Sequence, residues 1–450
     1  MILKQLALQK RKMDKGHSEL TEKIRQQYDS GLYPIVPLEK SPKSDRVWLY
    51  IHNLLTPYYL RSKKVKKATE IDILDAGCGN GYTSLLLAEA NPMAKIVGID
   101  ISEESIKLAK QRLQQHGFKN VEFHNLPIEN ISNLGRKFDY INCDEVLYLL
   151  NDPVAGLRAM HSVLKPDGII RTNLHSSLQR AYYYRAQKVF KTMGLMEGIP
   201  QQMEIDLVWE IMRALKDNVI LKQHTWDRDY EAEKELIAVN HLLVGDKGYT
   251  IPEMFSALKA ADLEFISMVN WRQWDLMDLF KEPDNLPVFL GLSLPEISTE
   301  ERLHLFELLH PIHRLLDFWC GHPNQAQSFV PVDEWVLSDW QQAKVYLHPQ
   351  LKTPDVKEEL LRCIAQLNQF AISKQLPITG QEVLVDSTIA ACLLPLWDEA
   401  QSMLSLVERW QILRPVHLVS LKPTTQEEAV EVVKQVLIKL EEIGYVLLET

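Results

Sequence analysis

The sequence lacks long apolar stretches and closely spaced cysteines. No apolar run approaches the ~18 residues that a membrane-spanning helix requires. The opening stretch "MILKQLALQKRK" is broken by basic residues before a signal-peptide core could form. Five cysteines are scattered along 450 residues and are never spaced as CxxC, which argues against a disulfide framework or a structural zinc site. We therefore expect a cytoplasmic enzyme or binding protein without a membrane span.

Positive charge is scarce outside the N-terminal part. The chain has a net charge of −10, yet residues 1–67 contain 15 Lys and Arg against 6 Asp and Glu, a net of +9. The remainder therefore carries −10 − 9 = −19. An acidic body argues against a large nucleic-acid footprint, so nucleic acid is not an expected partner.

Short apolar segments alternate with helical patterns in the first half of the chain. The expected strands are 71–77, 94–100, 120–126, 138–144 and 169–175. The stretch "SEESIKLAKQRLQQHG" predicts a helix that begins after Ser102 as N-cap and ends at Gly117. This alternation predicts an α/β fold with a doubly wound, mostly parallel sheet.

The pattern changes after residue 175. Residues 176–245 indicate helices, and residues 250–271 one helix and one strand. Near the end, Thr425 and Glu428 predict a capping box that opens a long helix ending at Gly444. The expected organisation is an N-terminal helical cap (1–70), a Rossmann-like core (71–178), a helical insertion with one helix–strand unit (179–297) and a mainly helical C-terminal domain (298–450).

The loop "ILDAGCGNG" (73–81) joins the first strand to the first helix. Its glycines follow the pattern GxGxG, whereas a dinucleotide fingerprint is GxGxxG. No Lys-Ser/Thr pair follows, as a Walker loop would require. The loop therefore favours a nucleotide-like ligand without a pyrophosphate.

This loop resembles the first motif of class I S-adenosylmethionine-dependent methyltransferases. The resemblance is strengthened by Asp100, "FDYINCDEVLYLL" and "VLKPDG", which follow in the expected order. It implies that Asp75 lies near the ammonium of the cofactor and that Asp100 accepts hydrogen bonds from both ribose hydroxyls. The cofactor-binding residues that it implies are Asp75, Gly77, Cys78, Gly79, Gly81, Asp100, Ile101, Leu126, Pro127, Ile128, Cys143 and Asp144.

One position departs from that family. Many members place an acid after the third strand to bind the adenine amine, and here Pro127 stands near that place. The resemblance then implies that adenine is held by the backbone around Leu126 and Ile128, with Asn125 or Glu129 as side-chain partners.

A second resemblance concerns the flanking segments. Residues 28–45 and 240–267 are similar to methyltransferases that carry a regulatory region and a C-terminal winged-helix-like domain, some of which methylate lysines on proteins. That group usually has a His-Gly pair where "CDEVLY" stands here.

Candidate acceptor-side residues follow the fourth and fifth strands. Asp144, Glu145 and Tyr148 follow the fourth, and Asn173 and His175 end the fifth. His175 is either the general base, because its pKa lies near neutrality, or a packed histidine. Either Asp144 or Glu145 could orient an acceptor amine, or one could cap the following helix.

The tyrosines and arginines of 179–187 form either a lid or a surface helix, and no metal site is expected.

We expect a methyltransferase that acts on an N or O nucleophile, with a protein side chain as one acceptor. A small-molecule natural-product methyltransferase and a non-catalytic S-adenosylmethionine-binding scaffold are the alternatives, and a homodimer is a further expectation. A closed cavity over the fourth and fifth strands would favour a small molecule, and an open groove a protein. A chain ending near Pro295 is expected to retain cofactor binding.

Overall fold

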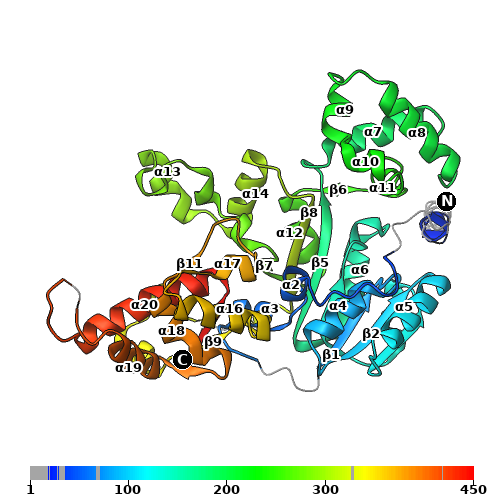
Figure 1. The fold of residues 1–450 in the computed structure, drawn as a ribbon. Coiled ribbons are helices and arrows are strands. Elements are labelled where there is room, and N and C mark those ends of the chain that lie inside the picture. The colour runs from blue at the N-terminus through cyan, green and yellow to red at the C-terminus, as the bar shows by residue number, and fades with distance from the viewer. Residues whose placement is uncertain are drawn as a thin grey trace.

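The computed structural model describes residues 36–66, 71–325, 329–417 and 419–450, together with positions 19, 21–27 and 29 (Figure 1). Of the N-terminal cap expected over 1–70, residues 1–18, 20, 28, 30–35 and 67–70 lie outside the described residues. Within the described ranges, no helix is both long and apolar enough to cross a bilayer.

An eight-stranded sheet forms the centre of the molecule, in the order β3-β2-β1-β4-β5-β8-β7, with β6 paired to β5. Its strands are β1 (Asp72–Ala76), β2 (Lys95–Asp100), β3 (Val121–Asn125), β4 (Phe138–Cys143), β5 (Leu164–Ser176), β6 (Gly248–Tyr249), β7 (Glu264–Met268) and β8 (Leu315–Gly321). Strands β1 to β6 pair in parallel, and β8 runs antiparallel to both β5 and β7. The expectation of a mostly parallel α/β sheet is confirmed.

Helices cover both faces of this sheet, because neighbouring strand residues point to opposite sides. Ile73 packs in the apolar cluster on one face and Leu74 in the cluster on the other. The first face is covered by α3 (Leu55–Ser62), α4 (Tyr82–Ala90) and α5 (Glu103–Gln115), and the second by α6 (Pro153–Ser162), α12 (Ile251–Ala260) and α14 (Thr299–Leu309). The Ser102 side chain caps α5 by accepting the backbone N–H of Ser105, as the sequence predicts.

The helical insertion follows the carboxyl end of β5 and stands above it in Figure 1. It consists of α7 (Ala181–Thr192), α8 (Gln202–Ala214), α9 (Ile220–Thr225), α10 (Arg228–Ala232) and α11 (Glu235–Asn240). These helices share an apolar core of their own, to which Phe190, Val208 and Ile237 belong. The insertion is therefore a small packed unit attached to the sheet.

The segment after residue 298 does not begin as a separate helical domain. Strand β8 fills the place between β5 and β7, so residues 315–321 belong to the central sheet. The boundary of the sheet-forming part therefore lies beyond the division expected at 298. The sequence pattern does not reveal this, because a short apolar run such as "LLDFWCG" fits a buried helix segment as well as a buried strand.

The C-terminal part has its own apolar core around two small antiparallel sheets. Its helices are α15 (Leu337–Gln342), α16 (Pro354–Ala365), α17 (Ile372–Gln375), α18 (Ser387–Leu393), α19 (Met403–Leu413) and α20 (Gln426–Ile443). Its strands are β9 (Lys344–Leu347), β10 (Phe370–Ala371), β11 (Leu384–Val385), β12 (Gln401–Ser402) and β13 (Val446–Glu449). The capping box of Thr425 and Glu428 is present, and Gly444 ends α20 in the left-handed region.

Two N-terminal helices, α2 (Arg46–Ile51) and α3, join the core to the C-terminal part. The hydroxyl of Tyr59 donates to the Glu441 carboxylate at 2.8 Å, and Thr56 Oγ1 lies 3.2 Å from His348 Nε2.

A short helix, α13 (Val288–Ser293), projects beside α14. Short 3-10 turns complete the description: Ile128–Leu134, Leu147–Leu149, Trp271–Gln273, Leu276–Leu279, Pro283–Asn285, Leu294–Glu296, Val332–Glu334, Pro349–Leu351 and Leu394–Trp397.

Candidate active site

The glycine loop lies between the end of β1 and the start of α4. The N–H groups of Gly77 and Cys78 donate to the Ile99 carbonyl at 2.8 and 2.9 Å, which ties the loop to β2. Gly81 has a φ of +79°, and a Cβ there would lie 2.6 Å from Cα of Ala109. At Gly79, by contrast, no heavy atom of the described chain lies within 4 Å of such a Cβ. The loop is thus packed at Gly81 and open at Gly79, where a ligand can approach the backbone.

Asp100 ends β2 directly beside this loop. Its Oδ2 accepts the N–H of Gly79 at 2.9 Å, and its Oδ1 accepts the N–H of Ser102 at 2.8 Å. Burial raises the pKa of this carboxyl. Each oxygen has capacity for a further hydrogen bond, so the residue fits two ribose hydroxyls. Its role on the cofactor stays a prediction, and its role in bracing the loop and α5 is observed.

Asp75 is buried beneath the loop. It accepts hydrogen bonds from the Ser84 hydroxyl at 2.6 Å and from the Asn142 amide at 3.0 Å. Burial raises its pKa to about 6. These bonds connect β1 to α4 and β4 at the carboxyl ends of two central strands. Contact of Asp75 with the cofactor's ammonium stays a prediction. Cys78 and Cys143 are also buried, and burial raises the pKa of both thiols.

The segment after β3 lies next to Asp100. The N–H of Leu126 and the side-chain amide of Asn125 both donate to the Asp100 carbonyl, at 2.9 and 3.0 Å. Pro127 precedes the 3-10 turn that begins at the buried Ile128. Ile101, which follows Asp100, is half-buried at the same edge. The backbone of this segment is therefore placed where the resemblance puts adenine, and that role stays a prediction.

A buried arginine organises the ends of β4, β5 and β8. Arg171 is only 2% exposed. Its Nη2 lies 2.7 Å from Oδ2 of Asp317 and 3.5 Å from Oδ1 of Asp144, and its Nη1 donates to the Asn142 amide oxygen at 3.2 Å. Asp144 also accepts the Asn173 amide at 2.5 Å. Asp144 is thus tied into a structural network that borders the loop.

Glu145 has an unusual backbone conformation, with a φ of +59°. Its N–H donates to the Asn173 side-chain oxygen at 2.9 Å, which helps to hold that conformation. Its Oε2 accepts the Tyr148 hydroxyl at 2.8 Å and Nη1 of Arg314 at 3.1 Å. Positive φ is uncommon in a residue other than glycine and costs free energy, so the surrounding bonds have to hold it. Burial opposes ionisation, but hydrogen bonds and the charge of Arg314 lower the pKa of Glu145.

His175 lies at the centre of a second buried network and is 1% exposed. Its Nδ1 is 2.6 Å from Oδ1 of Asp246, and its Nε2 is 3.0 Å from Nη1 of Arg314. The ring stacks on Tyr148 with a centroid distance of 3.7 Å. Because a guanidinium can only donate, Nε2 accepts, and the ring proton lies on Nδ1 against Asp246. His175 therefore presents the lone pair of Nε2 toward Glu145 and Arg314.

Asp246 is held from the helical insertion. Arg180 Nη2 and Gln187 Nε2 both donate to its Oδ2 at 2.9 Å. Burial opposes ionisation of this carboxyl, but the donors from His175 and Arg180 lower its pKa overall. The carboxylate is thus in place to fix the orientation of the His175 ring.

The sequence did not single out Asp246, Arg314, Arg171 or Asp317, whereas Arg180 is one of the two arginines of 179–187 for which both a lid and a surface helix were open. Each of the first four residues pairs with a partner more than 60 positions away along the chain, so no local spacing marks it. The tyrosines of 179–187 lie within the insertion: Tyr182 stacks on His224, and the Tyr230 hydroxyl donates to that of Tyr183 at 3.0 Å.

Among the described residues, no three His, Cys, Asp or Glu side chains gather in a way that could hold a metal ion.

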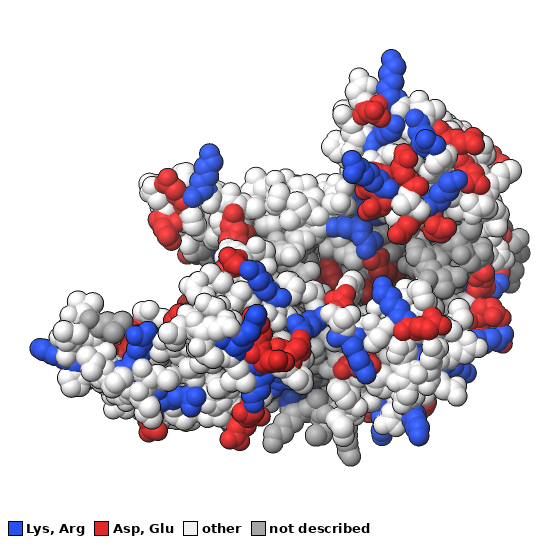
Figure 2. Space-filling model, in the orientation of Figure 1, with Lys and Arg blue, Asp and Glu red and all other residues white. Residues whose placement is uncertain are grey.

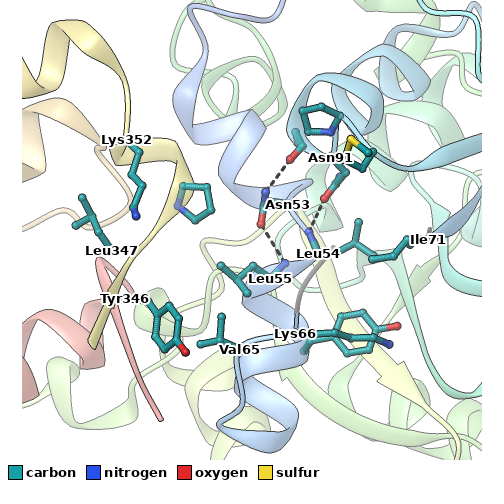
Figure 3. A pocket seen from close by; sticks show the side chains of 15 residues that line it. Asn53, Leu54, Leu55, Val65, Lys66, Ile71, Asn91, Tyr346, Leu347 and Lys352 are labelled. Carbon is teal, nitrogen blue, oxygen red and sulfur yellow. Dashed lines mark hydrogen bonds between the residues drawn. The ribbon is translucent and has the colours of Figure 1, made fainter. Parts of the chain in front are cut away.

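A cavity of about 320 Å³ lies far from this site, between α3, the end of α4 and β9 (Figure 3). Leu54, Ile71 and Leu347 contribute apolar walls, and Lys66 and Lys352 stand at its sides. Ile71 precedes β1, whereas the glycine loop follows it. The cavity is therefore at the opposite end of the sheet from the glycine loop.

Comparisons with known proteins agree with this arrangement. Residues 67–235 match the family model described as a methyltransferase domain. An uncharacterized protein of Synechococcus sp. is 26% identical over 324 residues, which cover 71% of this chain and 75% of that protein. A ubiquinone biosynthesis O-methyltransferase of Haemophilus ducreyi is 30% identical over 114 residues, but the match spans only 24% of this chain and 48% of that enzyme.

The fold as a whole is similar to that of PKMT2 from Rickettsia typhi in complex with AdoHcy. The TM-score is 0.58 at 16% identity, and the alignment covers 88% of this chain and 75% of that one. The likeness shows a shared fold that extends beyond the sheet. The family match, with the glycine loop, shows that residues 67–235 form a class I, S-adenosylmethionine-dependent methyltransferase domain.

Proposed function

We propose that the protein methylates an N or O nucleophile on a protein side chain. The supporting observation is the shape of the face beside β5: in Figure 2 the surface falls inward between the insertion and the projection made by α13 and α14, and it is open to solvent. An open groove suits an acceptor carried on a larger molecule, whereas a small molecule would favour an enclosed cavity. The fold likeness to PKMT2 covers 88% of this chain and therefore extends beyond the methyltransferase domain.

The chain's own residues account for the steps around the transfer. S-adenosylmethionine, when bound, supplies an activated methyl group, so the protein chiefly has to align the nucleophile and exclude water. The glycine loop and Asp100 would hold the cofactor. His175 would accept the nucleophile's proton on Nε2, and Asp246 would stabilise the imidazolium that results.

Several finer features belong to this proposal. The C-terminal part would be winged-helix-like and would help to place the acceptor. The protein would act in the cytoplasm, which the free, buried cysteines support. A homodimer would use the exposed Val288, Phe289 and Leu292 of α13.

Incubation with labelled S-adenosylmethionine and a cell lysate tests the proposal. We expect label in protein, and much less transfer with Asp100→Ala at a low concentration of S-adenosylmethionine. Label confined to small molecules would favour the natural-product alternative, and cofactor binding without any transfer would favour the scaffold alternative.

A further inference from the structure

The Arg314 side chain occupies a place that is built for a cation. It immediately precedes β8, and its guanidinium bridges the acceptor-side groups. Nη1 lies 3.1 Å from Oε2 of Glu145 and 3.0 Å from Nε2 of His175, and Nη2 contacts Oε1 of Glu145. The Tyr148 hydroxyl donates to Oε2 of Glu145 at 2.8 Å. One carboxylate and one ring nitrogen therefore converge on a single positive charge.

The two sides of this contact differ in how firmly they are held. His175 and Asp246 are 1% and 0% exposed in their side chains, and Glu145 is fixed through its backbone bond to Asn173. Arg314, in contrast, is 45% exposed. A long, half-exposed side chain can turn into solvent at modest cost, whereas the buried His175 and the backbone of Glu145 keep their positions.

We propose that Glu145, Tyr148 and His175 form a subsite for the positively charged amine of the acceptor, which Arg314 fills in the absence of substrate. This inference rests on the proposed function and narrows the nucleophile to an amine nitrogen, as on a lysine side chain. The Glu145 carboxylate attracts the ammonium of the acceptor, and His175 Nε2 accepts a hydrogen bond from one N–H of that ammonium. The proton moves to Nε2, and Nδ1–H stays on Asp246, so the imidazolium faces a carboxylate.

The transfer then balances without another reactant. The neutral amine lone pair forms the new N–C bond as the C–S bond breaks, and the electron pair of that bond stays on sulfur. The methylated nitrogen carries the positive charge that the sulfonium lost. Glu145 faces a cation before deprotonation and again after transfer, which suits a permanently ionised carboxylate.

Binding of n-butylammonium to Arg314→Ala tests the subsite directly. We expect calorimetry, with S-adenosylhomocysteine at saturation, to show binding at least tenfold tighter than to the unaltered protein. n-Butanol should not bind, because it lacks the charge, and Glu145→Gln in the Arg314→Ala background should abolish the gain. Arg362→Ala, which removes an exposed arginine whose partner among the described residues is Glu359 on its own helix, is the matched control. Equal binding of n-butanol, or retention after Glu145→Gln, would overturn the subsite.

A second measurement uses the unaltered protein. Label transferred to lysate protein should survive alkali and appear in methylated amino groups after acid hydrolysis. Alkali-labile label would overturn the amine assignment and leave the proposed methyl transfer to protein intact. Failure of S-adenosylhomocysteine to bind the unaltered protein would instead count against the proposed function.

Discussion

The backbone N–H of Gly79 donates to the Asp100 carboxylate at 2.9 Å. This bond links the open point of the glycine loop to the end of β2. Asp100 thereby shapes the loop and keeps hydrogen-bonding capacity for a ligand that lies against it.

Asp100→Ala should weaken binding of S-adenosylmethionine by about 1.5–3 kcal/mol, the range for hydrogen bonds to a charged group. Calorimetry measures the change directly. Asp167→Ala is the control, because Asp167 is exposed, pairs with Lys66 and lies at the other end of the sheet. If Asp100→Ala binds S-adenosylmethionine as tightly as the unaltered protein does, Asp100 does not bind the ribose.

Gly79 and Gly81 should respond differently to alanine. Gly81→Ala forces Cβ against the Ala109 backbone and should destabilise the fold by about 1–3 kcal/mol. Gly79→Ala also strains the backbone, because φ is +49° there, but its Cβ meets no described atom; it should therefore destabilise the fold less than Gly81→Ala and chiefly reduce cofactor affinity. Thermal unfolding without ligand, followed by cofactor titration, separates the two effects; equal melting temperatures for both variants would contradict the packing argument.

His175→Ala should lower turnover by roughly 10²–10⁴-fold while cofactor affinity stays nearly unchanged, because it removes the proton acceptor. Asp246→Asn should also lower turnover and shift the pH profile, because an amide no longer stabilises the imidazolium. Transfer of labelled methyl groups across a pH series measures both. A fully active His175→Ala with an unaltered profile would assign this residue to packing.

Acid should destabilise the protein through buried neutral histidines. Burial lowers the pKa of His52, His241 and His348 to about 3. Below a pH of about 6.5 these three histidines become protonated in the unfolded chain but stay neutral in the folded protein. The stability they contribute is complete above that pH and is lost as pH falls, by up to about 1.4 kcal/mol per pH unit for each ring.

His241→Phe isolates one such contribution, since the ring of His241 is surrounded by the rings of Tyr183, Phe190, Trp226 and Tyr230. Urea unfolding at pH 6.5 and 5.5 should show a loss smaller by about 1 kcal/mol in the variant. Asp75 and Asp317, whose pKa values burial raises to about 6, act in the opposite direction but equally in both proteins. Identical pH dependence would contradict the role of His241.

A chain ending at Pro295 should not fold, which reverses the expectation from sequence. The cut removes β8, to which both β5 and β7 pair. It also exposes apolar surface on α3 and the sheet, so we expect aggregation and no cofactor binding. Circular dichroism and calorimetry of the shortened chain measure this outcome. A soluble chain that binds S-adenosylmethionine would show that β8 is dispensable.

Local patterns predicted much of the fold. The glycine loop, the Ser102 cap and the capping box at Thr425 each depend on residues a few positions apart, so the sequence displays them directly. The place of β8 and the network around His175 depend on contacts between distant segments. Asp246 reaches His175 across 71 positions, and Arg314 reaches it across 139. Hydrophobic periodicity and secondary-structure propensity are properties of short segments, so they do not predict contacts between distant residues.

The position of β8 also governs the order in which the sheet can form. β7 precedes β8 in the chain but lies outside it, so β7 has no neighbour in the sheet until residues 315–321 exist. Residues 269–314, 46 in number, separate the two strands. At ribosomal rates of about 5–20 residues per second, synthesis of these residues takes roughly 2–9 seconds, and β7 stays unpaired for that time. During that interval the edge of β5 that later pairs with β8 is unpaired and can bind other strands, so we expect a nascent chain of this length to be prone to aggregation.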